Sequence, residues 1–74
     1  MPHLPVISGD EFAKALSKIG YTLDHMEGSH MILLHPSGQR LSVPRHAELG
    51  RGLLRALIKD AGLSRQEFVR LLRK

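Results

Sequence analysis

The apolar run Met31–Leu34 is the feature that most constrains how this chain folds. Turn-forming residues bound it on both sides, Gly28-Ser29 before it and Pro36-Ser37-Gly38 after it. A short apolar run between turn signals is typical of a buried strand, and its side chains point alternately to the two faces of a sheet. We therefore predict a central strand over residues 30–35, with helices on one face and a second apolar cover on the other.

The segments on either side of this run alternate between apolar and polar residues, which is the pattern of half-buried strands. The first segment starts with Tyr21 and Leu23 at its apolar positions and stops at Gly28-Ser29. The other covers residues 40–43 and ends at Pro44. Together the three segments predict an antiparallel sheet.

Helical spacing appears before and after these strands. Ser8 to Glu11 has the form of a capping box, the following apolar residues recur on one face, and Gly20 is placed to end a helix over residues 8–19. A broad leucine stripe after Gly52 predicts a second helix that stops at Gly62.

The two ends of the chain are less regular. Residues 1–7 hold two prolines and are expected to form an extended lead-in. A second capping box starts at Ser64, so residues 64–74 are expected to form a short terminal helix that frays. The fold class is α+β in one domain over residues 1–74, with the order helix, three-stranded antiparallel sheet, one or two helices.

Composition narrows the class of function. The chain has no cysteine, which excludes disulfides and thiolate metal sites, and no apolar run approaches the roughly 18 residues of a membrane span. We expect a cytoplasmic protein without a membrane role. Eleven Lys and Arg against seven Asp and Glu give a formal charge of +4, which favours polyanionic partners such as RNA.

Several cations follow one another near the second predicted helix. Arg51, Arg55 and Lys59 recur every four residues opposite the leucines, and Arg45 and His46 lie just upstream. Such a stripe can follow a phosphate backbone without reading sequence, or it can be a solvated helix face, and the spacing leaves both readings open.

Among the five histidines, His30 is the best placed for acid–base chemistry, because a strand directs its imidazole and its ordinary pKa lies near neutrality. Gly28 allows close approach of a substrate, and Ser29 can bind a phosphate oxygen. The alternative is a plain hairpin turn followed by a partly exposed histidine. A serine hydrolase is disfavoured because adjacent strand residues point to opposite faces. The histidine spacing also fits no metal site.

Four motifs in order resemble the HicA, or YcfA-like, family of toxins. They are Gly28-Ser29-His30, His35-Pro36-Ser37-Gly38, Val43 to Leu49, and Gly52 to Leu63. The resemblance implies a fold similar to the double-stranded RNA-binding domain and a ribosome-independent endoribonuclease that cuts mRNA without a cofactor.

The resemblance also implies a site and a partner. His30 is the catalytic residue that the resemblance implies. The turn chemistry and the cations described above make Gly28, Ser29, Arg45, His46, Arg51 and Arg55 the candidate substrate contacts. A HicB-like antitoxin is expected to cover the site in a type II toxin–antitoxin hetero-oligomer.

The chain departs from the family pattern at two places. Acidic Asp24 and Glu27 precede the histidine motif, and Leu53 stands where a threonine is usual. Because acids repel phosphates, a non-catalytic RNA-binding module of the same fold is the main alternative. A pure protein-interaction domain is a weaker one.

Overall fold

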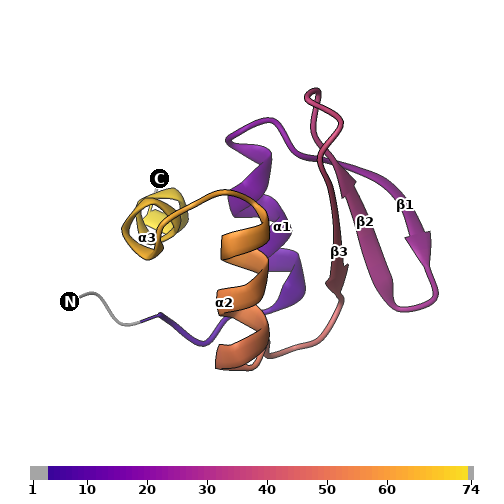
Figure 1. Cartoon of the computed structure of the whole chain (residues 1–74). Coiled ribbons are helices and arrows are strands. Elements are labelled where there is room, and N and C mark those ends of the chain that lie inside the picture. The colour runs from indigo at the N-terminus through magenta and orange to yellow at the C-terminus, as the bar shows by residue number, and fades with distance from the viewer. Residues whose placement is uncertain (1–3, 74) are drawn as a thin grey trace.

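The computed structural model describes residues 4–73, and its elements follow the predicted α+β order (Figure 1). The first three residues of the expected lead-in lie outside this range. The elements are α1 (Gly9–Ser17), β1 (Thr22–Glu27), β2 (His30–Leu34), β3 (Arg40–Pro44), α2 (Arg51–Asp60) and α3 (Arg65–Arg73). None of the described helices is long and apolar enough to cross a membrane.

Both predicted capping boxes are present. The Glu11 amide donates to Ser8 Oγ at 3.1 Å and the Ser8 amide donates to Glu11 Oε1 at 3.0 Å, and Ser64 and Glu67 make the same pair of bonds before α3. The helix α1 ends at Ser17, two residues earlier than predicted, and the chain turns away through Gly20 at φ 105°.

The sheet is antiparallel with the order β1-β2-β3, so the apolar run forms the central strand as predicted. The first strand begins at Thr22 rather than Tyr21, whose ring is buried beneath the sheet end. A register shift between Leu23 and His25 interrupts the regular pairing of β1 with β2. Beyond this bulge His25 pairs with Ile32.

All three helices lie on one side of the sheet (Figure 1). Met31 and Leu33 point into that side and join the main core, whereas Ile32 between them points to the other face. Ile32 is nevertheless only 3% exposed, although no second layer of described elements lies over it. Neighbouring side chains therefore cover Ile32 within the chain itself, and Leu34, 39% exposed, is the apolar side chain of β2 that stays open on this face. The expected second apolar cover stays a prediction about a partner.

The chain ends contribute to the core. Phe68 of α3 is fully buried and its ring centroid lies 5.2 Å from that of Phe12 in α1. The expected short terminal helix is therefore present as α3, and a buried aromatic pair packs it on the first helix. Fraying at its end stays a prediction. In the lead-in, Leu4 and Ile7 are buried, and the Leu49 amide donates to the Ile7 carbonyl at 2.8 Å.

Candidate functional site

His30 is the first residue of the central strand and follows a two-residue turn directly. Gly28 has φ 59°, a left-handed value that glycine adopts without strain. The turn makes Glu27 the cross-strand partner of His30, and Pro44 of β3 pairs with His30 on its other side. The His30 side chain is exposed, so a strand fixes its direction while solvent still reaches it.

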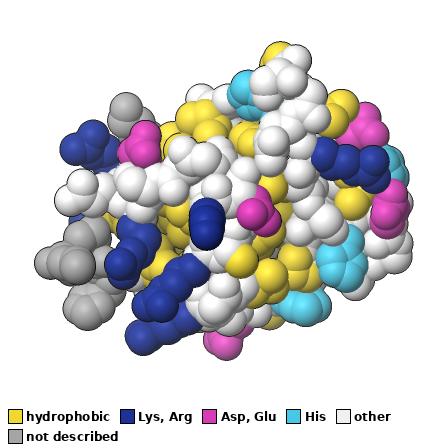
Figure 2. All heavy atoms as spheres, viewed as in Figure 1, with side chains coloured by type: hydrophobic (Ala, Val, Ile, Leu, Met, Phe, Trp, Pro, Cys, Tyr) yellow, Lys and Arg dark blue, Asp and Glu magenta, His cyan; other side chains and the backbone are white. Residues whose placement is uncertain are grey.

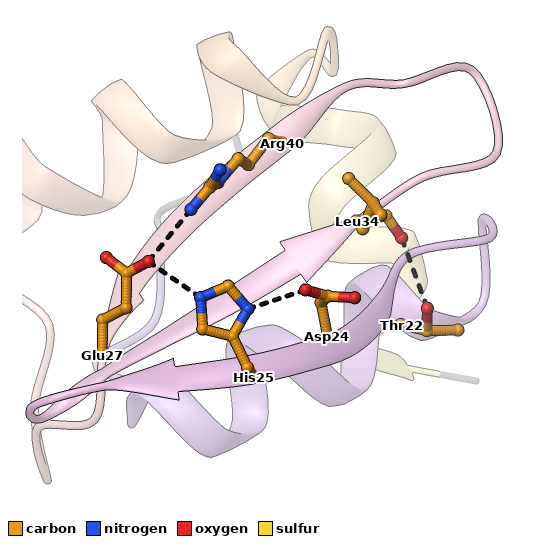
Figure 3. A network of polar contacts seen from close by, with 6 residues as sticks. All are labelled: Thr22, Asp24, His25, Glu27, Leu34 and Arg40. Carbon is orange, nitrogen blue, oxygen red and sulfur yellow. Dashed lines mark hydrogen bonds and ion pairs between the residues drawn. The ribbon is translucent and has the colours of Figure 1, made fainter.

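A polar network crosses the sheet face that carries His30 (Figure 3). One carboxylate oxygen, Glu27 Oε2, lies 2.8 Å from His25 Nε2 and 3.1 Å from an Arg40 guanidinium nitrogen. The other ring nitrogen, His25 Nδ1, lies 2.7 Å from Asp24 Oδ2. Side chains from β1 and β3 thus meet above β2. In the sheet register, Glu27 and Arg40 lie at positions on either side of Ile32.

The ion pairs shift the protonation of the network. The carboxylate of Glu27, and after it that of Asp24, raises the pKa of His25 above its ordinary value of 6.5. The hydrogen bond from His25 in turn lowers the pKa of Glu27, to which the charges of Arg40 and His30 add. Ionised carboxylates only accept hydrogen bonds, so both contacts are satisfied together when both His25 nitrogens donate, as they do in the protonated ring. All these groups are exposed, and salt screens their interactions.

The predicted substrate contacts next to the turn lie close to His30 in the fold. Gly28 and Ser29 form the turn itself, and the Arg45 amide donates to the Ser29 carbonyl at 2.8 Å. The Arg45 side chain points elsewhere, because its Nε donates to Asp10 Oδ1 at 3.1 Å. His46 is exposed in the loop after β3, and its carbonyl accepts a hydrogen bond from the Gly9 amide.

The remaining predicted contacts, Arg51 and Arg55, lie on a different side of the molecule. Both are exposed on α2, whose leucines face the core from the helical layer. Figure 2 shows Lys and Arg gathered over the helical side and histidines mostly over the sheet side. The structure therefore separates this stripe from the face of His30, although α2 begins at the same end of the molecule as the hairpin turn (Figure 1).

The network residues His25 and Arg40 are functional candidates that sequence reasoning missed. Continued without interruption, the alternation that starts at Tyr21 and Leu23 places His25 on the helix side of the sheet. The bulge after Leu23 reverses this and brings His25 to the face of His30. Counted back from the two-residue turn, parity instead makes Glu27 the partner of His30 and places His25 on the His30 face. The two local patterns disagree, and the observed strand pairing decides between them.

Another histidine, His35, has a structural role. Its Nε2 donates to the Ile19 carbonyl at 2.9 Å, its Nδ1 accepts from the Ser37 amide at 3.1 Å, and its ring packs on Tyr21. Within residues 4–73 no group of three or more His, Asp or Glu side chains could hold a metal ion.

The fold and the site define a small α+β domain with an exposed histidine at the start of its central strand, next to a network of two carboxylates, an imidazole and a guanidinium. Residues 9–63 match the family model described as the HicA toxin of bacterial toxin–antitoxin systems. The match covers most of the chain and runs from the start of α1 to Leu63, three residues after the end of α2, so the chain belongs to the HicA toxin family. No curated protein matched the chain.

Proposed function

We propose that this chain is the toxin of a type II toxin–antitoxin system and an endoribonuclease that cleaves mRNA without the ribosome. The observation that carries the proposal is the placement of His30, which is held by the central strand, exposed to solvent and beside the ion-paired network of His25, Glu27 and Arg40. Family membership supports the same conclusion, since the turn and His30 fall inside the matched residues.

In the proposed reaction His30 transfers a proton at the cleaved phosphodiester. Its neutral imidazole removes the proton of the ribose 2′-hydroxyl, and the resulting oxygen attacks the adjacent phosphorus. RNA supplies its own nucleophile, so the reaction requires no cofactor. A positioned proton-transfer group of this kind contributes about 10²- to 10⁴-fold in rate.

Replacing His30 tests this function directly. We expect purified His30→Ala protein to leave a labelled mixed-sequence RNA intact, or to cut it at least about 100-fold more slowly than the wild type. Thr22→Val is the matched control, because Thr22 lies on the same sheet face but outside the network. Circular dichroism checks folding. A folded His30→Ala protein that cleaves at the wild-type rate would refute the proposal.

A module that binds RNA without cutting it is the second candidate, and the acids beside the histidine are what favour it. In the structure both acids are in ion pairs, Asp24 with His25 and Glu27 with His25 and Arg40. Their charges are thereby largely compensated, so repulsion between these acids and a phosphate gives less reason to expect that cleavage has been lost. Salt-dependent binding of an RNA that stays intact would support this candidate.

We further propose that a HicB-like antitoxin neutralises the toxin by binding over the His30 side of the sheet. Support comes from β1, whose six residues are all exposed at a sheet edge, and from Leu34, a 39% exposed apolar side chain on the His30 face. An open strand edge with exposed apolar groups is a ready surface for a protein partner. Co-expression with the product of the adjacent reading frame, followed by co-purification and an RNA cleavage assay, tests this partner.

A further inference from the structure

A general base alone does not complete the cleavage of an RNA phosphodiester. When the 2′-oxygen attacks phosphorus, the bond to the 5′-oxygen breaks, and that oxygen needs a proton to depart as a hydroxyl. The site therefore requires a second proton-transfer group within hydrogen-bond reach of the leaving oxygen and a cation for the charge on phosphate. The face that carries His30 offers one imidazole and one guanidinium in addition to His30 itself.

The register places these groups at suitable separations. His25 is the cross-strand partner of Ile32, so His30, two residues earlier on β2, is its diagonal neighbour. Diagonal neighbours on one face of an antiparallel pair lie about 7–8 Å apart. Each imidazole reaches about 2.6–3.2 Å to a hydrogen-bond partner, so two of them can contact the attacking and leaving oxygens of one phosphate between them.

A carboxylate oxygen of the chain itself shows where an anion can bind on this face. Glu27 Oε2 accepts from both His25 Nε2 and Arg40, so the imidazole and the guanidinium converge on a single negatively charged oxygen. Glu27 is also the cross-strand partner of His30, and its side chain is exposed. A phosphate oxygen can therefore take the position of this carboxylate, while Asp24 continues to hold His25 Nδ1 at 2.7 Å.

We propose that His25 is the second proton-transfer residue of the site and that Arg40 binds the phosphate under attack, an inference that rests on the RNA cleavage proposed above. His30 takes the 2′-hydroxyl proton, and the 2′-oxygen forms a bond to phosphorus. The bond from phosphorus to the 5′-oxygen breaks, and His25 Nε2 gives that oxygen its proton. The products are a 2′,3′-cyclic phosphate and a 5′-hydroxyl, with His25 neutral and His30 protonated until both exchange protons with water.

The surroundings of His25 suit it to act as the acid of the pair. The charged or titratable side chains on its face are Asp24 and Glu27 from β1, His30 from β2 and Arg40 from β3. Of these, Glu27 and Asp24 contact the ring directly and raise the pKa of His25. When a phosphate oxygen replaces Glu27, the ring lies between that oxygen and Asp24 Oδ2, and two anionic neighbours favour its protonated form. His30 contacts no carboxylate in the structure and is free to begin as the base.

The test uses two versions of one RNA. A cleavage site is first mapped with the wild-type protein, and the same RNA is then made with sulfur in place of the 5′-oxygen at that site. Sulfur departs without a proton, so it removes the need for a general acid and leaves the need for a base. The rates of wild type, His25→Ala, His30→Ala and the control Thr22→Val are measured on both RNAs across pH.

We expect His25→Ala to slow cleavage of the ordinary RNA by about 10²- to 10⁴-fold and to regain nearly the wild-type rate on the sulfur RNA. It should also lose the decline in rate at alkaline pH, which reports deprotonation of the acid. His30→Ala should be slow on both RNAs. Because His25 is exposed on an edge strand, the variant should fold, and circular dichroism checks this.

Two results would overturn the inference alone. One is a His25→Ala protein that cleaves ordinary RNA at the wild-type rate, and the other is an equal loss on both RNAs, which would assign His25 to binding or structure. A wild-type protein that cleaves neither RNA would instead refute the proposed function and this inference with it.

Discussion

Gly9 shows how a single residue joins the helical layer to the strand that borders His30. A Cβ at this position would lie 2.1 Å from the Pro44 carbonyl oxygen, far inside van der Waals contact. The Gly9 amide also donates to the His46 carbonyl at 2.9 Å. The first turn of α1 therefore packs directly on the backbone at the end of β3, and Pro44 pairs with His30.

We predict opposite effects of alanine at two helical glycines. Gly9→Ala should lower the free energy of unfolding by about 1–3 kcal/mol, because the new methyl group overpacks against backbone that cannot move aside. Gly52→Ala should raise it by up to about 1 kcal/mol, because nothing lies within 4 Å of its Cβ position and alanine is the better helix former. Urea denaturation measures both. Equal effects at the two sites would contradict this account.

At the scale of elements, the hairpin of β1 and β2 depends on charge as well as on apolar packing. Most side chains of β1 are polar and its six residues are exposed, so it buries little apolar surface of its own. The ion pairs of His25, Glu27 and Arg40 instead tie it across β2 to β3. The hairpin that presents His30 should therefore respond to pH.

The direction of that response follows from the two shifted groups. The pKa of His25 is raised in the folded state, so its contribution is complete below its ordinary pKa of 6.5 and is lost as pH rises through the folded value. The pKa of Glu27 is lowered, so its contribution is present above 4.5 and is lost as pH falls through the folded value.

We therefore predict that the hairpin is most stable between about pH 4.5 and 6.5 and loosens as pH rises above 6.5 through the folded pKa of His25. Hydrogen exchange of β1 amides measures the hairpin separately from the core. In His25→Gln the loss of protection above pH 6.5 should disappear. A loss of the same size in this variant would show that another group is responsible.

At the scale of the whole molecule, positive charge and the histidine site are on different sides. The cations Arg55, Lys59 and Arg65 line a hollow of about 250 Å³ between α2 and α3, on the helical side. If His30 cuts RNA, the cations on the helical side can contact only the part of the RNA that continues around the molecule from the sheet face. They would then add sequence-independent affinity without taking part in the reaction.

We predict that Arg55→Glu weakens RNA binding at low salt and makes binding less dependent on salt concentration. Each phosphate contact to single-stranded RNA contributes a slope of about −0.7 to the dependence of log K on log salt, so the slope should shrink by at least that amount. The cleavage rate at saturating RNA should stay unchanged. Lys14→Glu on α1 makes the same change of charge elsewhere and serves as the control. An equal loss in both variants would indicate net charge rather than a tracking surface.

The sequence by itself determined the elements and the place of His30, because both depend on residues close together in the chain. Ser8 and Ser64 begin their helices by accepting hydrogen bonds from the amides three residues later in the chain. Gly28 and Gly38 lie in turns, where they adopt positive φ. The apolar run then follows as the central strand with His30 at its start.

Only the tertiary structure decided which side chains surround His30. Alternation from Tyr21 and parity from the hairpin turn place His25 on opposite faces, and the bulge after Leu23, which depends on how β1 fits against β2, decides that His25 shares the face of His30. Arg40 reaches Glu27 across a strand, from 13 residues away in the chain. Sequence spacing shows that cations and acids lie near His30 in the chain. Whether the acids repel a phosphate or are paired with cations depends on contacts that form only when the strands pair.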